Sequence, residues 1–222
     1  MNVRADGQFY ANILSDEDVV LSDIVRGALG SSRNVTNAYV RAGPRKYNFF
    51  DPKKVKAAIV TCGGLCPGLN DIIYHLFLTL NRVYGVTHVY GVRGGWSGFY
   101  DAKCPPMLPL SEENVAGIQH HGGTRLGTSR GGFDAKKICD ELRKRHINAL
   151  FVVGGDGTHR GAAKLFEMMK ERHMATAVVG IPKVRRDSLS LSRSFFFRDH
   201  ALTIITHMHT HTRTYVHPKK DD

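Results

Sequence analysis

The stretch Phe151-Val152-Val153-Gly154-Gly155-Asp156-Gly157-Thr158 joins a short apolar run to a segment of helical periodicity. An apolar run of this length, without polar alternation, is typical of a strand buried on both faces of a parallel sheet. Apolar residues then recur at helical spacing, so residues 157–173 are expected to form a helix. Three glycines around one aspartate therefore stand where a buried strand meets a helix.

The same succession of strand, loop and helix occurs elsewhere in the chain. Expected strands are residues 57–61, 88–92, 148–153 and 176–181, and expected helices are residues 69–80, 111–121, 135–146 and 157–173. Ser111, with Asn114 at the capping-box position, and Asp134 are the expected N-caps of two helices. Short connections between alternating strands and helices indicate an α/β fold with a Rossmann-like parallel sheet and helices on both faces. Ligands bind such sheets at the carboxyl ends of the strands, where the glycine-rich loops fall.

Three regions are expected along the chain. Residues 1–54 are an irregular extension that packs on the main domain, and residues 55–183 are the α/β domain. Residues 184–222 are rich first in Arg and Ser and then in alternating His and Thr, which is a low-complexity pattern expected to be a disordered tail. Metal binding by the histidines of this tail is the alternative interpretation.

Composition narrows the function classes. The chain has 222 residues, 42% of them hydrophobic, and a formal net charge of +11. Aromatic residues are not interleaved in a dense basic helix, so small anionic phosphoesters are favoured over nucleic acid as partners. No apolar run approaches the ~20 residues of a membrane helix and no signal-peptide pattern opens the chain, so we expect a cytoplasmic protein without a membrane partner. Cys62 and Cys66 have a zinc-like spacing but no second ligand pair nearby, so reduced thiols are expected.

The aspartate between glycines suits phosphate chemistry. Mg²⁺ in enzymes is commonly held by one or two carboxylates together with substrate phosphates, and Asp156 offers such a carboxylate. Gly155 and Gly157 let backbone N–H groups approach phosphate oxygens, and Thr158 falls in the first helical turn. This segment is a fairly specific signal for a phosphoryl-transfer enzyme.

Two further glycine loops have compatible chemistry. Residues 63–68 allow close approach of a phosphate to the backbone ahead of a helix N-terminus, although they match neither the dinucleotide fingerprint nor the Walker A loop. Residues 122–132 carry two arginines in a glycine-serine context, and Arg130 is a better candidate than Arg125 for a phosphate contact. Positive charge is needed there because charge develops on the equatorial oxygens of a transferring phosphoryl group.

Taken together, these motifs resemble those of the phosphofructokinases, in the plant and trypanosomatid type of ATP-dependent 6-phosphofructokinase. The resemblance covers roughly residues 49–183 and rests on four segments that occur in the family order. These segments are residues 60–71, 126–132, 154–158 and 180–183. The resemblance implies the fold of the phosphofructokinase N-terminal lobe, ATP and Mg²⁺ as cofactors, and phosphorylation of fructose 6-phosphate to fructose 1,6-bisphosphate in glycolysis. Members of the family form homo-oligomers.

The resemblance also implies roles for individual residues. Asp156 corresponds to the Mg²⁺ ligand, and Arg130 to the residue that stabilises transition-state charge. The implied nucleotide contacts are Gly64, Trp96, Arg130, Gly131, Gly155, Asp156, Gly157 and Thr158. For Trp96, simple packing is an equal alternative. Pyrophosphate-using relatives usually have Asp where this chain has Gly157, so ATP is the expected donor.

The sequence departs from the family directly after Lys183. The family continues Thr-Ile-Asp-Asn-Asp and takes its catalytic base from the first Asp, whereas this chain continues Val184-Arg185-Arg186-Asp187. The base is therefore not assigned, and the substrate lobe is not recognisable. We expect a truncated or misread gene product with impaired activity, the alternatives being an inactive or regulatory partner of intact subunits and, less favoured, a lipid or NAD kinase.

Overall fold

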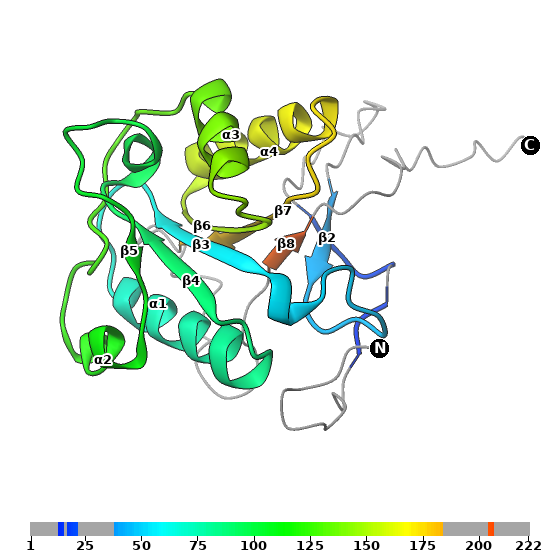
Figure 1. The fold of residues 1–222 in the computed structure, drawn as a ribbon, viewed down its shortest axis with the longest axis horizontal. Coiled ribbons are helices and arrows are strands. Elements are labelled where there is room, and N and C mark those ends of the chain that lie inside the picture. The colour runs from blue at the N-terminus through cyan, green and yellow to red at the C-terminus, as the bar shows by residue number, and fades with distance from the viewer. Residues whose placement is uncertain (1–12, 16, 22–37, 184–203, 207–222) are drawn as a thin grey trace, which may run out of the picture.

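Four parallel strands form the centre of the sheet in the computed structural model, which describes residues 13–15, 17–21, 38–183 and 204–206 (Figure 1). They are β3 (Lys56–Thr61), β4 (His88–Val92), β6 (Ala149–Gly154) and β7 (Ala177–Pro182), in the spatial order β7-β6-β3-β4. Ile59 of β3 pairs with Gly91 of β4 on one side and with Phe151 of β6 on the other. These strands agree with the expected ones to within a residue or two at each end.

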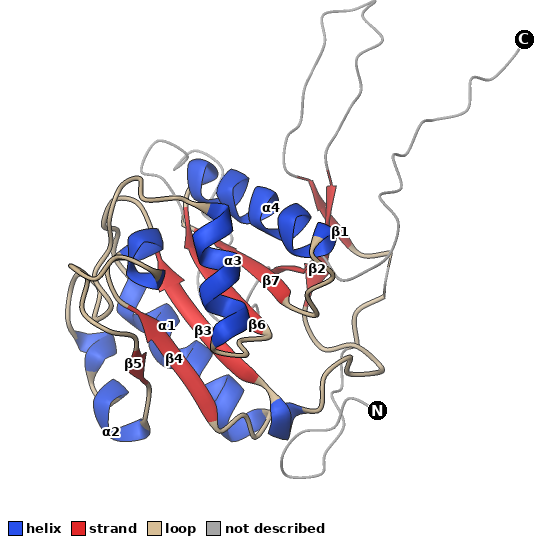
Figure 2. Cartoon of the chain, turned by 45° about the horizontal axis from the view of Figure 1, so that its top comes forward, coloured by secondary structure: helices blue, strands red, loops and turns tan. Residues whose placement is uncertain are grey.

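Helices cover both faces of this sheet, as expected for an α/β fold (Figure 2). On one face α1 (Leu69–Leu78), continued by one wider turn over Thr79–Val83, packs with Ala57 and Ile59. On the other face α3 (Ala135–Lys144) and α4 (Asp156–Glu171) pack with Ala58 and Val60. Alternate residues of one strand thus enter two separate cores, which explains why β3 is apolar without alternation.

Antiparallel strands extend the sheet at both edges. The short β5 (Leu108–Pro109) pairs with β4, and β8 (Ile204–Thr206) pairs with β7. Beyond β8 lie β2 (Ala38–Ala42) and then β1 (Val19–Leu21). The sheet is therefore mixed rather than wholly parallel, and part of the N-terminal extension joins it.

The expected helix over residues 111–121 is wrong in its length. Only α2 (Glu112–Val115) and a 3-10 turn, Ile118–His120, are helical, because Gly117 between them has φ 77° and breaks the helix. The start was correctly predicted, since the Ser111 hydroxyl accepts from Asn114 N–H and the Asn114 side chain accepts from Ser111 N–H. Two other 3-10 turns are Pro52–Lys54 and Gly95–Phe99.

The region predicted as a tail lies outside the described residues, apart from β8, and so does Asp187. Within the part of the chain that is described, no helix combines the length and apolar character needed to cross a membrane.

Candidate active site

Three loops meet at the carboxyl ends of β3 and β6: the first glycine loop (residues 62–68), the arginine loop (residues 122–132) and the aspartate turn (residues 154–158). Cys62 N–H donates to the Val153 carbonyl over 2.8 Å, and Gly63 N–H donates to the Ser129 carbonyl over 3.0 Å. The Thr128 hydroxyl donates to the Gly63 carbonyl over 2.7 Å. The three loops that the sequence singled out are therefore adjacent in space.

The aspartate turn presents free backbone donors at the start of a long helix. Gly155 is the N-cap of α4 in an extended conformation, and His159 N–H makes the first helical bond, to the Gly155 carbonyl, over 3.0 Å. The N–H groups of Asp156, Gly157 and Thr158 thus precede the first helical bond and lie at the positive end of the helix dipole. Asp156 and Gly157 are exposed, and this geometry binds phosphate groups in many proteins.

The glycines of the aspartate turn differ in the space that surrounds them. A Cβ on Gly154 would lie 2.5 Å from atoms of Thr158, so this glycine is required by packing of the helix start on the strand end. A Cβ on Gly155 or on Gly157 would meet no atom within 4 Å. Space is therefore open beside both glycines, and their contact with a phosphate stays a prediction.

Arg130 lies over the first glycine loop. A Cβ on Gly64 would be 3.7 Å from the Arg130 Nη2 atom, so the guanidinium occupies the space in front of this glycine. Arg130 and Gly131 are exposed, and Gly131 has φ 78°, a conformation that favours glycine. Gly64, Arg130 and Gly131 therefore form one surface.

Lys183 is a site residue that sequence reasoning did not assign. Its Nζ donates to the Cys62 carbonyl over 3.3 Å and also to the Gly64 carbonyl, and its backbone N–H donates to the Gly154 carbonyl over 2.8 Å. A Cβ on Gly63 would lie 3.2 Å from the same Nζ. The usable signal was its position directly after a predicted parallel strand, because such ends converge on the ligand site.

Trp96 is buried beneath the site. Its side chain is 4% exposed and packs against Phe99, at 6.2 Å between ring centroids, and against Phe133, at 5.3 Å. Its backbone N–H faces the Cys62 sulfur, which burial keeps protonated by raising the thiol pKa to about 12. Packing accounts for Trp96, and its contact with a nucleotide stays a prediction.

The donor set at the aspartate turn fits Mg²⁺ that is bound mainly through a phosphorylated ligand. The described residues contain no group of three His, Cys, Asp or Glu side chains that could hold a metal ion by themselves. One exposed carboxylate, that of Asp156, stands beside the N–H groups suited to phosphate. This is the arrangement in which a protein supplies one carboxylate and the substrate supplies the remaining ligands.

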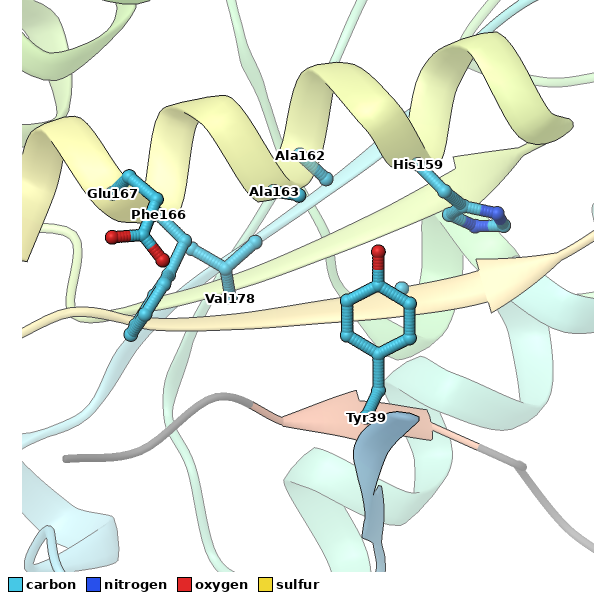
Figure 3. A pocket seen from close by; sticks show the side chains of 8 residues that line it. Tyr39, His159, Ala162, Ala163, Phe166, Glu167 and Val178 are labelled. Atoms are coloured by element: carbon cyan, nitrogen blue, oxygen red, sulfur yellow. The ribbon is translucent and has the colours of Figure 1, made fainter. Parts of the chain in front are cut away.

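A small hollow of about 60 Å³ lies elsewhere, between α4, β7 and β2 (Figure 3). It is lined by Tyr39, His159, Ala162, Ala163, Phe166, Glu167, Val178 and Gly180. Within the described part of the chain, the buried Nε2 of His159 has no hydrogen-bond partner, and burial lowers the pKa of this imidazole. None of the predicted site residues lines the hollow, so it is not part of the candidate active site.

The fold and the site define an α/β domain in which three glycine-containing loops gather at the carboxyl ends of parallel strands. The sequence pattern of the family described as "Phosphofructokinase" matches residues 56–215, so the chain belongs to the phosphofructokinase family. The match begins with β3 and extends beyond Lys183, the residue at which the recognisable family motifs end.

Curated relatives of this chain are named ATP-dependent 6-phosphofructokinases. The chain is 42% identical over 201 residues to ATP-dependent 6-phosphofructokinase 4, chloroplastic, of Arabidopsis thaliana, covering 88% of this chain and 37% of that protein. It is 45% identical over 158 residues to the ATP-dependent 6-phosphofructokinase of Borreliella burgdorferi, covering 71% of this chain and 35% of the relative. The Trypanosoma cruzi enzyme is 44% identical over 155 residues, covering 70% of this chain and 32% of the relative. The predicted likeness to plant and trypanosomatid members is confirmed, and the chain spans about a third of the length of these relatives.

Solved structures agree on the fold. Phosphofructokinase from Saccharomyces cerevisiae is 26% identical with a TM-score of 0.50, over 61% of this chain and 18% of the other. A pyrophosphate-dependent phosphofructokinase from Marinobacter aquaeolei is 18% identical with a TM-score of 0.52, over 59% of this chain and 34% of the other. The second likeness shows the fold alone.

Proposed function

We propose that this chain binds ATP with Mg²⁺ at the three converging loops, as the nucleotide half of an ATP-dependent 6-phosphofructokinase site. The observation that carries the proposal is the meeting of Gly64, Arg130 and Lys183 with the N-terminus of α4. Two cationic side chains and a set of free N–H groups face one space, which suits a polyphosphate. The relatives named above act on fructose 6-phosphate by name, and that substrate is part of the proposal.

Each residue has a proposed role in phosphoryl transfer. The N–H groups around Gly155 and Gly157 hold phosphate oxygens, and the first turn at Thr158 borders them. The guanidinium of Arg130 meets charge that develops on the transferring group, while the backbone at Gly131 approaches the nucleotide. The Asp156 carboxylate would hold Mg²⁺, which when bound neutralises phosphate charge.

Gly157 supports ATP rather than pyrophosphate as donor. The position is exposed, and a Cβ there would meet no atom within 4 Å, so no neighbouring atom obstructs the start of an acidic side chain. Such a carboxylate would place a second negative charge beside Asp156 and the phosphates, which favours a smaller donor. The absence of this charge is therefore a matter of ligand choice rather than of space.

We further propose that the chain phosphorylates fructose 6-phosphate poorly by itself. The residues after Lys183 lack the family's Thr-Ile-Asp-Asn-Asp pattern, whose first Asp takes the proton from the sugar 1-hydroxyl. Nucleotide binding does not need that base, whereas turnover does. A coupled assay on the purified chain should show ATP-dependent turnover near background, and robust activity would contradict this second proposal.

The binding proposal is tested with two arginine variants of one loop. Arg130→Gln should weaken ATP binding, measured by calorimetry with Mg²⁺ present, by about tenfold or more, because a charge-assisted contact contributes roughly 1.5–3 kcal/mol. Arg125→Gln is the matched control and should bind with nearly wild-type affinity. Wild-type protein that binds no ATP, or equal losses in both variants, would contradict the assigned site.

A further inference from the structure

Among the described residues only two polar side chains are fully buried, Thr61 at 0% exposed and Asn70 at 5%. Thr61 ends β3, and Asn70 is the second residue of α1. The proposed phosphate chemistry uses neither side chain. Because a buried polar group must be hydrogen-bonded, the partners of these two residues indicate what they are for.

Both residues bind the start of the arginine loop. The Asn70 Nδ2 donates to the His121 carbonyl over 2.9 Å, and its Oδ1 accepts from the Arg125 N–H over 2.6 Å. The Thr61 hydroxyl donates to the Gly127 carbonyl over 2.7 Å. A single amide thus closes the segment from 121 to 125 against the first turn of α1.

The bond between Thr61 and Thr124 has a defined direction. Their hydroxyl oxygens are 3.1 Å apart, and the one proton of Thr61 already goes to a carbonyl, which can only accept. Thr124 therefore donates to Thr61, and its oxygen in turn accepts from Leu126 N–H over 3.3 Å. With Leu126 itself 1% exposed, the loop is fixed by polar and apolar contacts together.

Polar side chains along the loop point inward, whereas its two arginine residues are exposed. Thr128 bonds to Gly63 and Ser129 to Gly94, the latter over 2.8 Å. We propose that Asn70 is a positioning residue that holds the arginine loop, and with it Arg130, against the carboxyl end of the sheet. The catalytic value of this placement rests on the proposed function, but the placement itself does not.

Trypsin gives a direct readout of the loop. Cleavage between Arg125 and Leu126 requires local opening, since Leu126 is buried, and its rate follows the population of the open loop. In Asn70→Ala two hydrogen bonds are lost, and this cut should become about tenfold faster or more. Cleavage between Arg143 and Lys144, at the end of α3, is the internal reference for opening outside the arginine loop and should keep its wild-type rate.

The chain offers a matched control amide. Asn114 also accepts from one backbone N–H, that of Ser111, and donates to one backbone carbonyl, that of Pro109 over 2.8 Å. Asn114→Ala should leave the cut after Arg125 unchanged. A wild-type rate at this bond in Asn70→Ala, or equal acceleration at Arg125 and Arg143, would overturn the positioning role.

Asn70→Asp keeps the test decisive if the alanine variant does not fold. The carboxylate has almost the same size, is favoured near a helix N-terminus, still accepts from Arg125 N–H and no longer donates to the His121 carbonyl. Its cleavage after Arg125 should be faster than in wild type, because the carboxylate faces the His121 carbonyl with no proton to donate, and a wild-type rate would count against the proposal.

ATP affinity separates a positioning role from a packing role. Under conditions where it is folded, Asn70→Ala should bind ATP about tenfold more weakly, while Asn114→Ala binds like wild type. Unchanged affinity in a variant with an opened loop would overturn the positioning of Arg130. If wild-type protein binds no ATP, the proposed function fails, and the ratio of the two cleavage rates still decides whether Asn70 holds the loop.

Discussion

At the end of β6, neighbouring positions are occupied by glycine for different physical reasons. Gly154 is crowded by Thr158, whereas Gly157 faces open space. Gly157 was identified from the sequence as the position that selects the donor, and its exposure makes a charge test possible without a steric artefact.

Gly157→Asp should fold and lose ATP affinity by about tenfold or more, as expected when a second carboxylate faces the polyphosphate. Stability should not fall, because an acidic residue in the first turn of α4 interacts well with the helix dipole. Calorimetric titration with ATP and urea unfolding measure the two effects. Gly157→Asn has the same size without the charge and should retain most of the affinity; a similar loss in both variants would assign the effect to bulk.

The single thiol of Cys62 makes the stability of the fold depend on pH. Burial raises its pKa from 9.0 to about 12, so the folded state keeps its proton when the unfolded chain has lost it. The unfolded state then binds fewer protons, and stability should fall between pH 9 and pH 12 by at most about 1.4 kcal/mol for each pH unit. Below pH 9 this group contributes no slope.

Urea unfolding of wild type and Cys62→Ala at several pH values between 8 and 10.5 checks the sign. Cys62→Ala should be less stable at neutral pH because it leaves a small cavity. Its stability should fall less steeply above pH 9 than that of wild type. Parallel curves for the two proteins would show that Cys62 does not titrate differently on folding.

At the scale of elements, the junction of β6 and α4 is fixed by contact between its two ends. A Cβ on Gly154 would come within 2.5 Å of Thr158. Gly154→Ala should therefore lower the free energy of unfolding by about 1–3 kcal/mol, the usual cost of overpacking. Gly155→Ala, one residue on, meets no atom within 4 Å and should stay within about 0.5 kcal/mol of wild type in urea unfolding. Equal costs at both positions would refute the packing account of Gly154.

The elements that sequence could predict are those whose signal is local. The strands β3, β4, β6 and β7 are short apolar runs between glycines, polar residues and helices, and both N-caps expected at Ser111 and Asp134 were correct. The break at Gly117 was missed because the apolar period continues across it to Ile118. Edge strands were missed for another reason: β5 has two residues, and β2 pairs with β8, far along the chain.

The residues of the candidate site likewise divide into those that a local sequence pattern predicts and those that it does not. Gly64, Arg130 and Asp156 lie in recognisable motifs, and the structure places their loops together. Lys183 and Asn70 act through hydrogen bonds to loops 119 and 55 residues away, respectively. No local pattern reports such bonds, so they emerge only when parallel strands bring their carboxyl ends to one edge.

At the scale of the whole molecule, the site exists only when the sheet is assembled. Two of its loops follow β3 and β6, the arginine loop follows the 3-10 turn Ile118–His120, and Lys183 follows β7. The two cores on either face of the sheet share these strands. An unfolded chain cannot present this arrangement, so ATP should bind the folded state alone. Binding then adds about 2.7 kcal/mol to the free energy of unfolding when the ligand is at one hundred times its dissociation constant.

Hydrogen exchange can show whether this gain is shared by both cores. Amides that exchange only through global unfolding, in β3, β6 and the interior of α4, should all gain the same protection with ATP and Mg²⁺. Arg130→Gln at the same ATP concentration should gain far less, which separates site binding from a general effect of the polyanion. Protection limited to the three loops would mean that the ligand suppresses local opening only, and that the sheet and its two cores do not unfold as one unit with the site.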